Sequence, residues 1–238
     1  MGTNTMRKQQ GFTLIEIAIV LVIIGLLLGG VLKGQELINA ARVRNIASQL
    51  DGVKVAYLGF QDRYRAYPGD VGDAQAAAQI PNATVGCGTA GTGFCGNGKI
   101  DPAENLVAWS HLSKSGFISG SYNGVVGTTQ ATFQTPTTAD APSNPFGGFM
   151  AIVHDQDYGD GTTTPANVLN IKTGGSIPAA TIAELDRKVD DGLAYSGQFR
   201  TTITYGSQAA GCTTGTNGTN TLAYANIDIK ACGGTAIQ

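Results

Sequence analysis

Residues 12–32, FTLIEIAIVLVIIGLLLGGVL, decide the fold of this chain. Nearly all of these 21 residues are apolar, and as a helix they span roughly 30 Å, the thickness of the hydrocarbon core of a bilayer. Arg7 and Lys8 precede the run, and no acidic residue occurs in the first ten positions. Because positive charge stays on the cytoplasmic side, we predict one membrane span that keeps the N-terminus in the cytoplasm and exports the rest.

A cleavable secretory signal peptide is the alternative explanation of such a run. The run is longer than a signal core of about 7 to 15 residues, and Lys33 follows it in place of a small-x-small cleavage site. A plain signal anchor fits the length but does not explain Glu16, an ionisable residue inside the run. A charged residue costs about 2.5 to 3.5 kcal/mol at mid-membrane and less near the surface, so Glu16 indicates a partner.

Residues 8–16, KQQGFTLIE, resemble the prepilin processing motif: a short basic leader ending in Gly, then Phe, then Glu five residues into the mature chain. This motif is typical of the type IV pilin superfamily, which includes the pseudopilins of type II secretion. The resemblance implies that a membrane aspartyl peptidase cuts after Gly11 and methylates the new amine of Phe12. It also implies that Glu16 pairs with the N-terminal amine of a neighbouring subunit, which supplies the buried cation that the carboxylate needs.

The apolar run continues, without a Pro or a turn cluster, into a half-buried helical pattern. Its apolar and aromatic residues alternate at spacings of four and three: Ile46, Leu50, Val53, Tyr57, Phe60, Tyr64 and Tyr67. We expect one helix that ends near Ala66, because the sequence Tyr67-Pro68-Gly69-Asp70 follows. The predicted parts of the chain are a cleaved leader (1–11), the transmembrane and assembly half of the helix (12–33), its amphipathic half (34–66) and an exported domain (67–238).

The exported domain carries sequence patterns of both strands and helices. Stretches of apolar, β-branched or alternating residues predict antiparallel strands at 148–154, 168–172, 199–205 and 221–229. A helix is expected at 102–115, with Asp101 as its N-cap and Gly116 at its end. A second is expected at about 181–189, where Thr181 and Glu184 fit a capping box. The predicted fold class is α+β and pilin-like, a long N-terminal helix packed on a small antiparallel sheet with inserted loops.

Four cysteines lie in the exported domain, at positions 87, 95, 212 and 232. They show no CxxC spacing and no paired His typical of zinc, and an even count in an exported chain indicates disulfides. Cys212 and Cys232 lie near the C-terminus, where many pilins have a disulfide-closed loop, and Cys87 and Cys95 would close a glycine-rich loop. We therefore predict local pairing rather than either of the other two connectivities.

Two acidic segments are candidates for binding calcium, and no other cofactor is expected. Asp155, Asp157 and Asp160 form an acidic loop before Gly161, and the resemblance adds that major pseudopilins bind calcium in a loop of their soluble domain. The segment from Asn97 to Glu104 fits the second half of an EF-hand loop, but its first half does not fit, and a plain turn is the preferred interpretation.

Other chemistry receives little support. The two histidines, His111 and His154, belong to no nucleophile–base or HExxH pattern, so we do not expect an enzyme. A net charge of −2 leaves no basic surface on which nucleic-acid binding would have to rest.

The resemblance implies a structural subunit of a type IV pilus-like filament that polymerises through its N-terminal helix. The expected partners are copies of itself and other pilins, a prepilin peptidase, membrane lipid, and an inner-membrane assembly platform with its ATPase. The expected location is the inner membrane, followed by a surface pilus or a periplasmic pseudopilus. The alternatives are a pseudopilin of a type II secretion system and a membrane-anchored calcium-binding or sensor protein.

Overall fold

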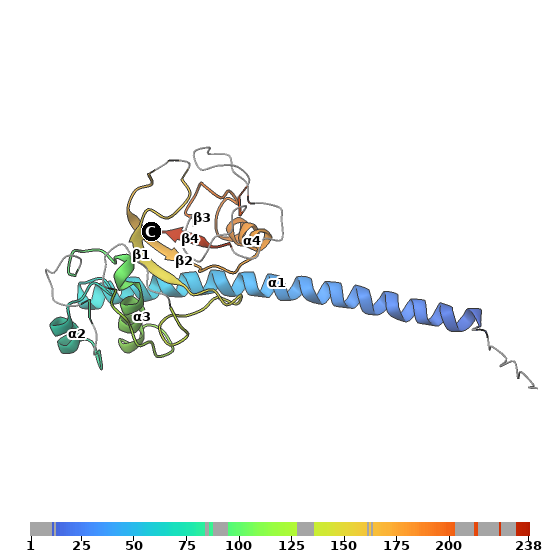
Figure 1. The fold of residues 1–238 in the computed structure, drawn as a ribbon, viewed down its shortest axis with the longest axis horizontal. Coiled ribbons are helices and arrows are strands. Elements are labelled where there is room, and N and C mark those ends of the chain that lie inside the picture. Colours follow the sequence, from blue (N-terminus) through green and yellow to red (C-terminus); the bar gives the residue numbers. More distant parts are fainter. Residues whose placement is uncertain are drawn as a thin grey trace, which may run out of the picture. The chain divides into compact units, whose positions relative to one another are not determined.

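A computed structural model describes residues 11, 13–83, 86–87, 95–127, 136–160, 162, 164–202, 212–213, 224 and 232–238. The chain forms two compact units, unit 1 (Met1–Ala41) and unit 2 (Arg42–Gln238). The first helix, α1 (Leu14–Tyr64), begins in unit 1 and ends in unit 2 (Figure 1).

Unit 1 has no core of its own, since none of its described residues is buried. Its part of α1 consists of Leu, Ile, Val, Ala and Gly with few polar residues, and contains no Pro that would interrupt the helix. Within the described part of the chain, α1 is the one helix long and apolar enough to cross a membrane. The helix predicted from the apolar run is confirmed.

The second part of α1 belongs to the core of unit 2. The predicted stripe is confirmed, because its members from Ile46 to Phe60 are buried and Tyr64 and Tyr67 are partly buried against the same core. The helix ends at Tyr64, two residues before the predicted end, because Arg65 takes a left-handed conformation with φ of 55°. Gly69 is needed in the following turn: its φ is 95°, and an added Cβ would lie 3.0 Å from the carbonyl oxygen of Glu104.

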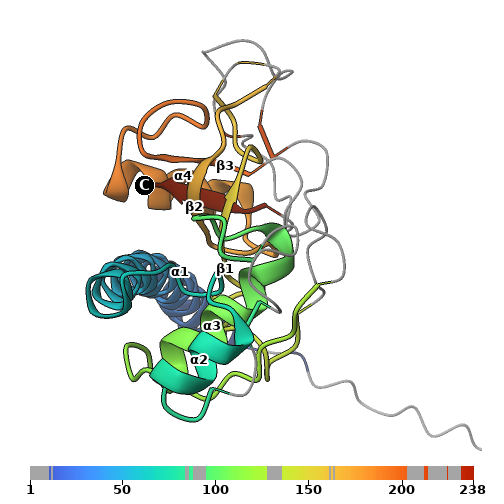
Figure 2. The same cartoon turned by 90° about the vertical axis from the view of Figure 1, so that its left-hand side faces the viewer.

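Unit 2 contains the predicted small antiparallel sheet, in the order β1-β2-β4-β3. Its strands are β1 (Ala151–Asp155), β2 (Val168–Lys172), β3 (Phe199–Thr201) and β4 (Gly234–Ile237). In Figure 2, the sheet lies on one side of the part of α1 that belongs to unit 2, and α3 lies beside that same part of the helix. Buried residues of α1, α3 and the sheet form one hydrophobic core.

The strand predictions are confirmed in the first part of the sheet, but they do not include its strand β4. The stretch 168–172 matches β2, β1 starts three residues later than predicted, and β3 begins at Phe199 as predicted. The predicted strand 221–229 lies outside the described residues except Tyr224, which forms an isolated bridge with Thr213. The strand beside β2 and β3 is β4, which was not predicted. It begins with a glycine because the Phe199 ring fills the space that a side chain at Gly234 would need.

The helices of unit 2 correct the sequence analysis in two places. The predicted helix at 102–115 is confirmed as a 3-10 turn, η1 (Pro102–Glu104), followed by α3 (Asn105–Lys114), with Asp101 as N-cap. Helix α4 (Ala179–Val189) starts two residues earlier than predicted, because the N–H of Thr181 already donates to the carbonyl of Pro178. The Thr181–Glu184 capping box is therefore wrong, and Glu184 pairs with Lys188 at 2.8 Å instead.

One further helix, α2 (Asp73–Gln79), was not predicted, although three consecutive alanines favour it. The predicted local disulfides are confirmed: Cys87 is bonded to Cys95, and Cys212 to Cys232.

Candidate functional site: the start of the N-terminal helix

The N-terminus of α1 is closed by a reciprocal pair of side-chain contacts. The N–H and hydroxyl of Thr13 donate to Oε2 of Glu16 at 2.8 and 2.7 Å, and the N–H of Glu16 lies 3.4 Å from the Thr13 hydroxyl oxygen. This is a capping box, in which N-cap and third helical residue satisfy one another's backbone donors. The helix therefore begins at Leu14, one residue beyond Thr13.

The contact between Thr13 and Glu16 was not predicted, although the spacing Thr13-x-x-Glu16 is typical of a capping box. The predicted partner of Glu16 was a cation. The structure gives Glu16 a hydrogen-bonded partner in its own chain. The Thr13 contacts use only Oε2, so the box leaves Oε1 for a further partner.

The surroundings of Glu16 in unit 1 are apolar and open. The large apolar residues that follow it are between 46% and 75% exposed from Ile17 to Leu32. They are Ile17, Ile19, Val20, Leu21, Val22, Ile23, Ile24, Leu26, Leu27, Leu28, Val31 and Leu32. An apolar surface of this extent around a carboxylate needs lipid or other protein to cover it.

The predicted cleavage position lies just before the capping box. Gly11 is exposed, and a Cβ added there would meet no atom within 4 Å. Phe12, the predicted site of methylation, lies outside the described residues. The structure thus places Gly11 and Glu16 at one exposed end of α1, and a substitution at Gly11 would disturb no packing.

Comparison with known families gives a match to the family described as the prokaryotic N-terminal methylation motif, over residues 6–32. The match covers Gly11, Phe12, Glu16 and the membrane-spanning run. The match supports a prepilin of the type IV pilin or pseudopilin kind, a class of structural subunits that are substrates of prepilin peptidases and assemble with other pilins. No curated protein and no solved structure matches the chain.

The predicted calcium loop is arranged around a lysine. Nζ of Lys172, which is fully buried, lies 2.9 Å from Oδ2 of Asp155 and 2.8 Å from Oδ2 of Asp157. Asp160 instead accepts hydrogen bonds from the N–H and hydroxyl of Thr162. Burial raises the pKa of Asp155, and the ammonium of Lys172 opposes that rise. Calcium at Asp155, Asp157 and Asp160 stays a prediction, and the ion would have to compete with Lys172 for two of its three ligands.

A second acidic group lies at the end of α4, where carboxylate oxygens of Asp186, Asp190 and Asp191 lie within 4.8 Å of one another. Asp190 accepts from the N–H of Phe199, and Asp191 accepts from the N–H of Leu193 and the Ser196 hydroxyl. These hydrogen bonds hold the loop from α4 to β3.

Both histidines bind backbone groups. Nδ1 of His111 accepts from the N–H of Gly69, and Nδ1 of His154 accepts from the N–H of Ile100. Burial lowers the pKa of His154, which favours the neutral ring that accepts this bond. The segment from Asn97 forms a turn whose amides at Asn97 and Gly98 donate to Asp70.

Proposed function

We propose that this chain is a structural subunit of a type IV pilus-like filament, cut after Gly11, methylated at Phe12 and polymerised through α1. The observation that carries the proposal is the methylation motif on residues 6–32, joined to a helix whose apolar residues are exposed throughout unit 1. A subunit with such a helix needs a membrane before assembly and other helices after it.

Cleavage would create a positively charged partner for the Glu16 carboxylate. Removing residues 1–11 makes Phe12 the first residue, and its secondary amine stays protonated at neutral pH. Phe12 and Glu16 are four residues apart, a separation that would be about 6 Å along the axis if the processed chain were helical from Phe12 onward. A neighbouring copy shifted along the helix axis can bring its amine closer, and Oε1 of Glu16 is available while Oε2 remains in the capping box.

Unit 2 supports this role because it holds its own fold. It contains the hydrophobic core, the four-stranded sheet and both disulfides, so its stability does not depend on the leader that is removed. An inner-membrane platform protein and an ATPase would draw the processed subunit out of the membrane. The filament would be a surface pilus, or a periplasmic pseudopilus if the chain serves type II secretion.

The test uses a deletion strain that carries the wild-type chain or Gly11→Val. We expect the wild-type chain to lose residues 1–11, to gain a methyl group on Phe12, and to appear in a filament fraction. Gly11→Val should remain full length and in the membrane, because the open space around Gly11 means that the substitution changes recognition and not folding. Mass spectrometry of the N-terminal peptide measures both steps, and an uncut wild-type chain that still forms filaments would overturn the proposal.

The same strains separate the two kinds of filament. Surface fibres seen by electron microscopy that vanish on deletion, with protein secretion unchanged, indicate a pilus. Loss of secretion with intact surface fibres indicates a pseudopilus. Glu36→Gln is a suitable control for the procedure, since Glu36 is exposed on α1 and pairs with the nearby Lys33 at 2.6 Å.

A further inference from the structure

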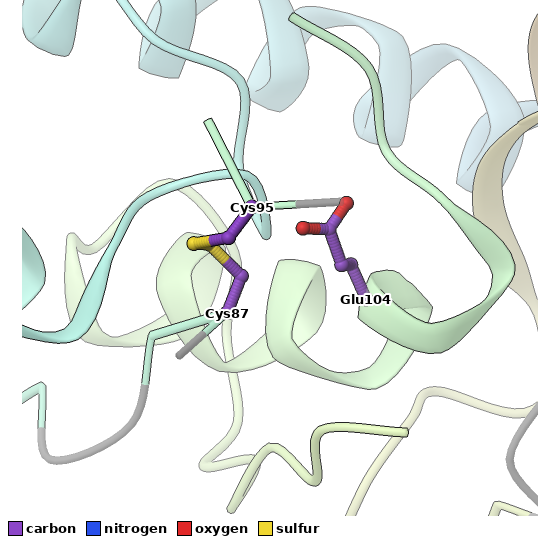
Figure 3. A group of neighbouring side chains, drawn as sticks. All are labelled: Cys87, Cys95 and Glu104. Atoms are coloured by element: carbon purple, nitrogen blue, oxygen red, sulfur yellow. A yellow bond between two sulfur atoms is a disulfide. The ribbon is translucent and has the colours of Figure 1, made fainter. Parts of the chain in front are cut away.

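A buried carboxyl group lies beside the first disulfide of unit 2. A carboxylate oxygen of Glu104 and the two Sγ atoms of Cys87 and Cys95 all lie within 4.8 Å of one another. Figure 3 shows the Glu104 side chain pointing from its helix toward the disulfide, with its carboxyl group on the side of Cys95. Glu104 is 0% exposed, and the two cysteines are 2% and 4% exposed.

Of the two carboxyl oxygens of Glu104, Oε2 takes part in capping the helix and Oε1 does not. Oε2 accepts from the N–H of Asp101 at 2.8 Å and completes the capping box of the η1–α3 helix. Oε1 is buried and has no hydrogen-bond partner among the residues that the structure describes. A buried polar atom without a partner costs about 1 to 3 kcal/mol, so an oxygen kept in this position points to a role beyond capping.

The surroundings keep Glu104 protonated at neutral pH. Burial raises its pKa to about 9, although the hydrogen bond from Asp101 lowers it, and the charges of Asp70 and Asp101 raise it further. Asp70 is itself fixed, because it accepts from the amides of Asn97 and Gly98, two and three residues after Cys95. The facing charged groups are therefore both acidic, and they hold a proton on Glu104.

Thiol–disulfide exchange at Cys87–Cys95 can use a proton from a neighbouring group such as Glu104. When a thiolate attacks one sulfur of a disulfide, the other sulfur leaves as a thiolate, and exchange is faster when that leaving group is stabilised. A cysteine thiol has a pKa of about 8.5, close to that of Glu104, and a proton donor works best when its pKa is near that of the group it protonates.

We propose that Cys87–Cys95 is a thiol–disulfide exchange site at which Glu104 is the proton donor. In the reducing direction, a thiolate of an external dithiol bonds to Sγ of Cys87 and the S–S bond breaks. The bonding electron pair goes to Sγ of Cys95, which takes the proton of Glu104. The second thiol of the dithiol, as its thiolate, then attacks the mixed disulfide, so the dithiol is oxidised and both cysteines become thiols once Cys87 takes up a proton. The reverse sequence forms the bond, with the Glu104 carboxylate as proton acceptor.

The second disulfide provides an internal control. Cys232 exchanges backbone hydrogen bonds with Ile177 at 3.1 and 2.9 Å. Within the residues that the structure describes, no carboxylate group clusters with Cys212 and Cys232 as Glu104 does with the first pair. Both cysteines are also buried, at 4% and 1% exposed, so the two disulfides differ in their acidic neighbour more than in their burial.

The experiment measures the reduction of each disulfide separately, in the full-length chain in detergent micelles, with dithiothreitol as the dithiol. Samples are acid-quenched and alkylated, and each cysteine peptide is counted by mass spectrometry. Glu104→Gln keeps the acceptor for the Asp101 N–H but has no proton to give. We expect it to slow reduction of Cys87–Cys95 at pH 7 by about tenfold or more and to leave Cys212–Cys232 within about twofold.

A structural role alone would not produce the expected pH profile. We divide the rate of reduction of Cys87–Cys95 by the concentration of dithiothreitol thiolate at each pH. In the wild-type chain this normalised rate should fall as pH rises through about 9, whereas Glu104→Gln should show no such fall. Equal or faster reduction of Cys87–Cys95 in the variant, or the same profile in both chains, would overturn the proposal. If the variant does not fold, the reduction rates of the wild-type chain in heavy water and in ordinary water test the proposal. Heavy water should slow the reduction of Cys87–Cys95 more than that of Cys212–Cys232. Equal slowing of the two disulfides would contradict proton transfer from Glu104.

Discussion

Two glutamates close the first turn of a helix in this chain, Glu16 at the start of α1 and Glu104 at the start of the η1–α3 helix. In each, Oε2 accepts from the backbone N–H three residues earlier at 2.8 Å. Their surroundings are opposite, since Glu16 is exposed among apolar residues of unit 1 and Glu104 is fully buried beside a disulfide of unit 2.

The difference shows that the capping box fixes the position of the carboxyl group, whereas its surroundings determine whether it pairs with a cation or keeps its proton. Both capping boxes leave Oε1 outside the motif. Glu16 can meet a cation from a second molecule, because no described residue of unit 1 covers it. Glu104 keeps its proton, because burial and two neighbouring aspartates disfavour its charge. Substitutions around Glu16 in unit 1 should therefore affect binding to other subunits. Substitutions around Glu104 in the core of unit 2 should affect the stability of that unit through its internal charges.

The largest expected effect in the buried region is at Lys172. Lys172→Ala leaves Asp155 and Asp157 without their shared cation, and removing one partner of a buried ion pair costs about 3 to 5 kcal/mol. Chemical denaturation of the full-length chain measures the loss. The matched control is Lys188→Ala, whose exposed pair with Glu184 should contribute less than about 1 kcal/mol. Similar losses for the two variants would show that the buried charges are not held by internal pairing.

The next effect is the pH dependence caused by Glu104. Its pKa is about 9 in the folded chain and 4.5 as an ordinary side chain, so the unfolded state loses this proton first. The stability from the neutral carboxyl is complete below pH 4.5 and is lost as pH rises toward about 9, by at most about 1.4 kcal/mol per pH unit. Glu104→Gln should remove this slope. Denaturation midpoints of both chains at pH 5, 7 and 9 measure it, and parallel curves would contradict a buried neutral Glu104.

The smallest effect compares the two N-caps. Asp101→Ala removes a cap inside the core of unit 2 and should lower its free energy of unfolding by about 0.5 to 2 kcal/mol. Thr13→Ala removes the equivalent cap in unit 1 and should leave the unfolding of unit 2 unchanged. Hydrogen exchange at the start of α1 should still increase. A shift of unit 2 unfolding by Thr13→Ala would show that the two caps do not act locally.

Much of the fold could be predicted because it follows from periodicity. The membrane run, the buried stripe of α1, the capped helix after Asp101 and strand β2 each carry a pattern with one structural solution. Strand β4 could not be predicted in this way. It begins with a glycine, because its place in the sheet depends on the Phe199 ring of a distant strand, and no local pattern records that contact.

The candidate site was predicted in part. Gly11, Phe12 and Glu16 follow from the motif, and local disulfide pairing follows from position along the chain. The role of Lys172 between two aspartates could not be predicted, because β1 and β2 bring these residues together only in the folded sheet. The proximity of Glu104 to Cys87 was equally hidden, since 17 positions separate them in the sequence.

The most direct test of the account is the incorporation of Glu16→Gln into filaments. The amide can still accept the Thr13 hydrogen bonds, so α1 should remain capped and the peptidase should still cut after Gly11. Only the charge is removed. We predict processed, methylated subunits that stay in the membrane, with at least a tenfold drop in the filament fraction and normal assembly of Glu36→Gln. Normal incorporation of Glu16→Gln would contradict the pairing of Glu16 with the amine of a neighbouring subunit.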